Sequence, residues 1–138
     1  MAILFFSEDV SKPKLQRRAI VNWLKSCIAN YNKVPGNINY IFCSDEYLKA
    51  ININYLGHDY YTDIITFNYN EKEKLNADIF ISIERVEDNA AKFNVNFLDE
   101  LLRVMIHGIL HLVGFKDESS TDKKKMREEE TKNLNRFV

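Results

Sequence analysis

Two histidines and an aspartate form the most specific chemical pattern in this 138-residue sequence. His107 and His111 are four residues apart, so on a helix both side chains lie on one face, where a single metal ion can bridge them. Gly114 follows, and glycine readily adopts the left-handed conformation that ends a helix and turns the chain. This turn is expected to bring Asp117 toward the two imidazoles. Three protein ligands leave a fourth position for water, which is typical of a catalytic metal site.

The residues around the histidines favour a ligand role over chance spacing. The segment from Met105 to Val113 is mostly apolar, so the two imidazoles are expected to be largely buried. A buried imidazole without a partner is costly, and a metal ion supplies that partner. Asp117 alone is equally well explained as a surface carboxylate in the polar segment 116–122, so its assignment depends on its spacing from the histidines.

This region also resembles a known enzyme family. Residues 107–117, HGILHLVGFKD, resemble the HGxLHLxGYDH signature of the YbeY endoribonucleases. Residues 55–67, YLGHDYYTDIITF, resemble the YRGKDxxTDVLSF segment of that family. Residues 77–82, ADIFIS, resemble its GDIxIS strand. The resemblance implies a metal-dependent endoribonuclease that hydrolyses single-stranded RNA, in ribosomal RNA 3′-end maturation and ribosome quality control. The expected partner is ribosomal RNA or the small ribosomal subunit, and neither DNA nor a membrane is expected as a partner. The expected cofactor is one divalent metal ion, and zinc is the first candidate.

Two departures from the family pattern affect the expected site. The family's third histidine is Asp117 here, and a hard oxygen ligand lowers the preference for zinc over iron, manganese or nickel. The arginine that follows the tyrosine of the upstream segment is Leu56, which has no guanidinium for a phosphate. The donor set therefore suits several divalent ions, and other residues have to bind the phosphate.

Two further residues are candidates for catalysis. His58 lies two residues after Leu56 and can supply part of the missing positive charge when protonated, although an exposed histidine in a Gly-His-Asp turn explains it too. Because no glutamate follows His107, another group has to accept the proton from water, and Asp63 is a candidate. Its alternative role is to bind backbone amides at the start of a strand.

Three alternative functions remain open. A zinc metalloprotease has a similar ligand spacing but needs a glutamate where this chain has Gly108. A non-haem iron oxygenase uses two histidines and a carboxylate, which are expected on strands rather than on one helical turn. In a ribosome-associated binding protein, the metal would only attach the C-terminal segment to the core, and activity assays would separate this case from an enzyme.

The elements that position these residues are expected to form a single catalytic α+β domain at 1–138. We predict a four-stranded mixed sheet covered by about five helices, with the metal-binding helix central. A last helix with only Met126, Leu134 and Phe137 to bury is expected to be thinly attached. Strands are predicted at 2–6, 37–43, 64–69 and 77–83, the last two as a hairpin, and helices from Ser11 to near Pro35, then at 44–54, 84–93, 96–113 and 122–135.

Composition sets further limits. Apolar residues make up 46% and charged residues 28%, as in ordinary globular proteins, and Cys27 and Cys43 are expected to be free buried thiols. The N-terminus lacks the basic flank of a signal peptide and the run 101–115 is too short to span a membrane, so we expect a cytoplasmic protein. A net charge of −1 means that RNA has to be bound by local basic groups. Two such groups occur: Lys12, Lys14, Arg17 and Arg18, and Lys123, Lys124, Lys125 and Arg127.

Overall fold

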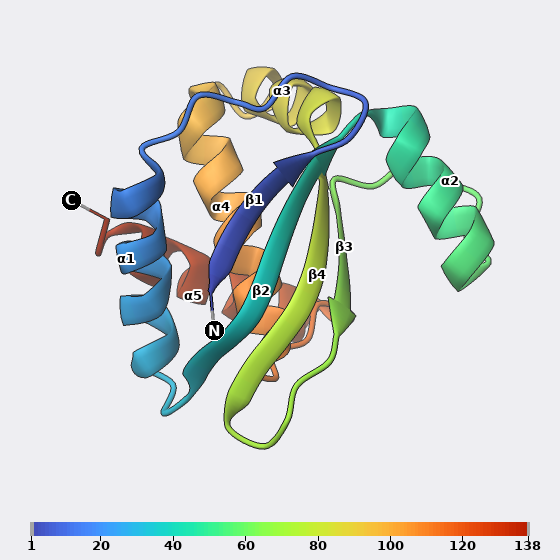
Figure 1. Cartoon of the computed structure of the whole chain (residues 1–138). Coiled ribbons are helices and arrows are strands. Elements are labelled where there is room, and N and C mark those ends of the chain that lie inside the picture. Colours follow the sequence, from blue (N-terminus) through green and yellow to red (C-terminus); the bar gives the residue numbers. More distant parts are fainter. Residues whose placement is uncertain (1, 138) are drawn as a thin grey trace.

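A four-stranded mixed sheet lies at the centre of the chain, as predicted (Figure 1). The computed structural model describes residues 2–137, so Met1 and Val138, the ends of the predicted domain, lie outside it. The strand order is β1-β2-β4-β3; β2 pairs in parallel with β1 and β4, and β3 pairs antiparallel with β4. The strands are β1 (Ile3–Ser7), β2 (Val34–Cys43), β3 (Ile64–Asn68) and β4 (Lys74–Ser82). The helices in the described part are α1 (Arg17–Ala29), α2 (Asp45–Leu56), α3 (Ile83–Lys92), α4 (Phe97–Leu112) and α5 (Ser120–Leu134).

Helices cover both faces of the sheet. Ile38, Tyr40 and Phe42 alternate along β2 and face the larger core, to which α1, α3, α4 and α5 also contribute. The opposite face packs against α2 through a smaller cluster that includes Cys43 and Leu48. Both cysteines are free and buried, as predicted. No helix among residues 2–137 is both long and apolar enough to cross a membrane.

Helix α4, which carries both histidines of the predicted metal site, is the most enclosed helix in residues 2–137, because it lies between the sheet, α3 and α5 (Figure 1). Asn96 caps its start by accepting a hydrogen bond from the backbone N–H of Asp99 at 2.8 Å. The buried Tyr40 hydroxyl donates to the carbonyl of Met105 at 2.9 Å and ties the helix to β2. At Gly108 the helix approaches the sheet so closely that an added Cβ would lie 3.1 Å from Ile64 Cδ1.

Several predicted boundaries differ from the structure. The first helix begins at Arg17 rather than at Ser11, because residues 8–16 first cross the top of the sheet (Figure 1). The first helix was predicted to end near Pro35, but α1 ends at Ala29. Strand β2 begins at Val34, and its register against β4 shifts between Pro35 and Ile38. Strand β4 begins at Lys74, three residues before the predicted start.

The prediction that the last helix is thinly attached is wrong. Helix α5 begins with a capping box between Ser119 and Asp122 and buries Met126, Glu130 and Asn133. Leu134 and Phe137 pack only partly against the core. The indole N–H of Trp23 donates to the backbone carbonyl of Asn133 at 2.8 Å and joins α5 to α1. Polar contacts therefore also attach α5 to the rest of the domain, and the pattern of apolar residues does not predict such contacts.

Candidate metal centre

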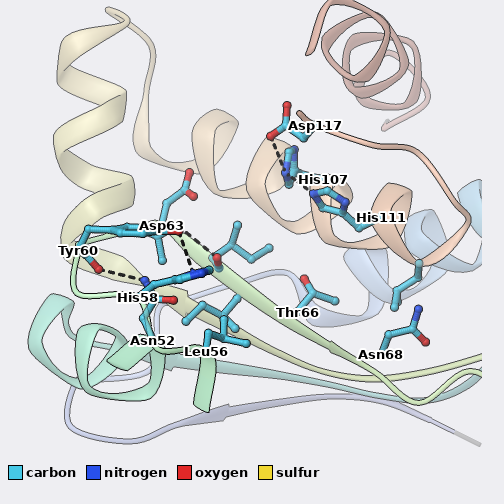
Figure 2. A pocket seen from close by; sticks show the side chains of 14 residues that line it. Asn52, Leu56, His58, Tyr60, Asp63, Thr66, Asn68, His107, His111 and Asp117 are labelled. Carbon is cyan, nitrogen blue, oxygen red and sulfur yellow. Dashed lines mark hydrogen bonds and ion pairs between the residues drawn. The ribbon is translucent and has the colours of Figure 1, made fainter. Parts of the chain in front are cut away.

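The structure brings the three predicted ligands together. The Nε2 atoms of His107 and His111 are 3.1 Å apart, and His107 Nε2 is 3.6 Å from Asp117 Oδ2. One ligand atom from each residue lies within 4.8 Å of the other two (Figure 2). A tetrahedral ion with bonds of about 2.1 Å holds its ligand atoms about 3.4 Å apart. The three side chains therefore fit one metal ion.

The end of helix α4 explains how Asp117 reaches the histidines. Gly114 has φ +111°, a conformation that favours glycine. The N–H of Phe115 donates to the Leu110 carbonyl at 3.0 Å and that of Gly114 to the His111 carbonyl at 3.1 Å, which is a Schellman motif. The Asn70 side chain donates to the Leu112 carbonyl at 2.9 Å and fixes the same end to the β3–β4 connection.

Glu130 of α5 orients His107, and sequence reasoning missed it. His107 Nδ1 is 2.6 Å from Glu130 Oε2, and Arg103 donates to the other carboxylate oxygen at 2.9 Å. A carboxylate that accepts the Nδ1 proton leaves the Nε2 lone pair free for a metal, as in many carboxylate–histidine–metal sites. Glu130 lies 23 residues from His107 in a run of three glutamates, so no local spacing distinguishes it.

The site is electrostatically adapted to a cation. Burial alone would lower the pKa of His107, but the hydrogen bond and charge of Glu130 raise it above its usual value. Burial and the neighbouring charge of His107 lower the pKa of His111, which favours the neutral imidazole that a metal needs. For Glu130, burial acts to raise the pKa, but the hydrogen bond and charge of His107 outweigh it and lower the pKa below its usual value. This carboxylate therefore stays ionised.

A cleft of about 530 Å³ opens beside the ligands (Figure 2). Both candidate catalytic residues, His58 and Asp63, line it together with the three ligands. Burial raises the pKa of Asp63, and the charge of His107 lowers it only in part. His58 Nδ1 is 3.0 Å from the Tyr60 hydroxyl, so its Nε2 remains for other contacts.

A second cavity, of about 270 Å³, adjoins the ligands on the side of α5. Lys123 and Arg127 line it with His107, Asp117 and Glu130. One of the two predicted basic groups thus contributes two cations beside the metal centre. In the described part of the chain, none of the basic residues at 12–18 lines either of these two cavities.

A cluster of two histidines and a carboxylate beside an open cleft, on an α+β fold, is typical of a metal-dependent hydrolase. The family model described as endoribonuclease YbeY matches residues 6–138. The chain belongs to this endoribonuclease family. It is therefore an enzyme of a class that hydrolyses RNA.

Relatives and a solved structure agree with this assignment. The chain is 45% identical over 134 residues to an endoribonuclease YbeY of Parabacteroides distasonis, covering 97% of this chain and 94% of that protein. It is 51% identical over 120 residues to that of Flavobacterium johnsoniae, covering 87% and 86%. The solution structure of TM1509 from Thermotoga maritima matches with a TM-score of 0.69 and 28% identity, over 99% of this chain and 89% of that one.

The alternative functions are not favoured by these relatives, and the structure gives a physical reason against the protease. An added Cβ at Gly108 would contact Ile64 Cδ1 at 3.1 Å and Ile79 Cδ1 at 3.2 Å. Position 108 therefore faces the sheet rather than the ligands, and a glutamate there would have to enter the core. The position of a protease's general base does not exist in this packing.

Proposed function

We propose that residues 1–138 form one catalytic domain that cleaves single-stranded ribosomal RNA, at 3′ ends of the small-subunit RNA, in the cytoplasm. The observation that carries the proposal is the convergence of His107, His111 and Asp117 at the wall of a cleft, with Glu130 bonded to the far nitrogen of His107. Zinc is the proposed ion, because two imidazoles and one carboxylate form a familiar catalytic set for it.

The chain's own groups divide the remaining work. When bound, the metal supplies a Lewis acid that polarises a phosphoryl oxygen and makes water more acidic. Asp63 accepts the proton of the attacking water, since burial brings its pKa closer to neutrality and it lines the same cleft. Arg127 and Lys123 bind phosphate in the adjoining cavity and replace the arginine missing at Leu56. His58 contacts the RNA through Nε2.

The proposal is tested by measuring zinc content and RNA cleavage on the same preparations. Wild type, His107→Ala and Glu128→Gln are compared on a small-subunit RNA precursor with an unprocessed 3′ end, in single-stranded form and annealed to a complement. Glu128 is an exposed neighbour of Glu130 and serves as the matched control. We expect His107→Ala to lose zinc and cleavage, the control to keep both, and the duplex to resist.

Two results would overturn the proposal in different ways. Zinc retained at full occupancy in His107→Ala would reject the ligand assignment. Zinc lost from this variant, with no RNA cleaved even by the wild type, would reject hydrolysis and favour a binding protein with a structural metal.

A further inference from the structure

His58 and Tyr60 form a stacked pair on the wall of the metal-site cleft. Their ring centroids are 5.3 Å apart with an angle of 16° between the planes, and 54% of Tyr60 is exposed. Both rings line the cleft that also contains the metal ligands, and Figure 2 shows Asp63 between the pair and His107. A large exposed aromatic surface therefore lies in the space where the substrate has to bind.

A buried asparagine holds this pair in place. Asn52 is only 2% exposed, its backbone carbonyl accepts from the N–H of His58 at 3.0 Å, and its side-chain amide donates to the carbonyl of Tyr60 at 3.1 Å. Gly57, with φ +69°, ends α2 just before the pair. The loop is thus fixed at both aromatic residues, so the rings are preorganised although they are exposed.

The chemistry of this wall suits a nucleobase better than a phosphate. Leu56, 45% exposed, lines the same wall and adds an apolar surface. Unpaired bases stack on aromatic side chains whatever their identity, because every base has a π-face. Bases within a duplex have their faces covered by their neighbours, so a stacking wall selects single strands.

We infer that the His58–Tyr60 pair is a stacking platform for one unpaired nucleobase of the RNA. Asn52 is the positioning residue that orients the platform. The inference rests on the proposed endoribonuclease function and deepens it by assigning the contact that selects unpaired RNA.

The platform is tested with short fluorescent RNA strands that are identical except for one abasic site, moved position by position along the strand. The affinity of the protein for each strand is measured by fluorescence anisotropy, and KM and kcat for cleavage are measured on the same strands. We expect one abasic position to weaken binding and raise KM about tenfold. Tyr60→Ala should raise KM for the intact strand about tenfold, with kcat retained, and remove the sensitivity to the abasic site. Tyr60→Phe, which keeps the ring, should stay close to wild type.

Tyr69→Ala is the matched control, because Tyr69 is 56% exposed and its side chain lines a different cavity. It should leave binding and cleavage unchanged. If wild type cleaves strands with abasic sites as well as the intact strand, and Tyr60→Ala cleaves as wild type does, the platform is overturned while the proposed function stands. Binding that depends on Tyr60 and on the base, without cleavage, would support the platform and reject hydrolysis. No binding at all would overturn both.

Discussion

At the centre of the site, His107 is held from two sides. Its Nδ1 contacts Glu130, and its Nε2 faces His111 and Asp117. The second oxygen of Glu130 is bonded to Arg103, so this carboxylate cannot rotate without breaking a charged hydrogen bond. The imidazole is therefore oriented before a metal binds.

This orientation predicts the effect of Glu130→Gln. The amide keeps the shape of the side chain but loses the charge that makes His107 a stronger ligand. We expect zinc affinity to fall roughly 10- to 100-fold, measured by calorimetric titration. Glu128→Gln on the same helix should match wild type. Equal affinities for all three proteins would show that Glu130 does not support the metal ligand.

The carboxylate at position 117 predicts how metal preference changes. Replacing Asp117 with histidine exchanges a hard oxygen donor for a softer nitrogen and restores the third histidine of the YbeY signature. We expect Asp117→His to raise the affinity for zinc relative to manganese in a competition titration. Glu118→His, at an exposed neighbouring position, is the control. An unchanged preference would mean that residue 117 does not contact the ion.

At the scale of elements, the site depends on two helix ends. The Schellman turn after α4 directs residues 115–117 back across the last helical turn, and the capping box of α5 begins the helix that carries Glu130. The two histidines thus come from α4, Asp117 from the connection that follows it, and the supporting carboxylate of Glu130 from α5.

Gly114→Ala tests the first of these ends. At φ +111° a side chain is strained, so we expect the free energy of unfolding to fall by roughly 1–2 kcal/mol, measured in urea. Zinc affinity should fall too, because Asp117 is displaced. Gly57→Ala also places a side chain at a positive φ, +69°, after α2, and should lower stability by less and leave zinc affinity unchanged. If Gly114→Ala binds zinc as tightly as wild type, the turn at Gly114 is not needed to position Asp117 for the metal.

At the scale of the whole molecule, the Glu130–His107 contact couples stability to pH in the metal-free protein. Glu130 has a pKa below its usual 4.5, so its contribution is complete above pH 4.5 and is lost as pH falls through the lowered pKa. His107 has a pKa above its usual 6.5, so its contribution is complete below pH 6.5 and is lost as pH rises through the raised pKa.

We therefore compare the free energies of unfolding of wild type and Glu130→Gln across pH, in urea with EDTA. The difference should be largest between about pH 4.5 and 6.5 and should shrink on both sides. Because the two proteins share their other titrating groups, the difference isolates this pair. A difference that does not change with pH would contradict the assigned pKa directions.

Much of the fold and part of the site follow from local sequence. Apolar patterning together with capping and turn residues predicted the four strands and five helices of residues 2–137, because helix and strand geometry set which positions share a face. The same geometry placed His107 beside His111, and the glycine turn accounts for Asp117. These relations act within a few residues, so the sequence contains them directly.

Tertiary structure alone decided the strand order, the firm docking of α5, the bond from Glu130 to His107 and the stacked rings in the cleft. The helix boundary at Arg17 also depended on the path of the chain across the sheet. Contacts between residues far apart in the sequence arise only when packing brings their elements together, and polar contacts leave no periodic pattern. The two-histidine clamp was therefore predictable from the sequence, whereas the carboxylate that orients it and the stacking of the two rings were not.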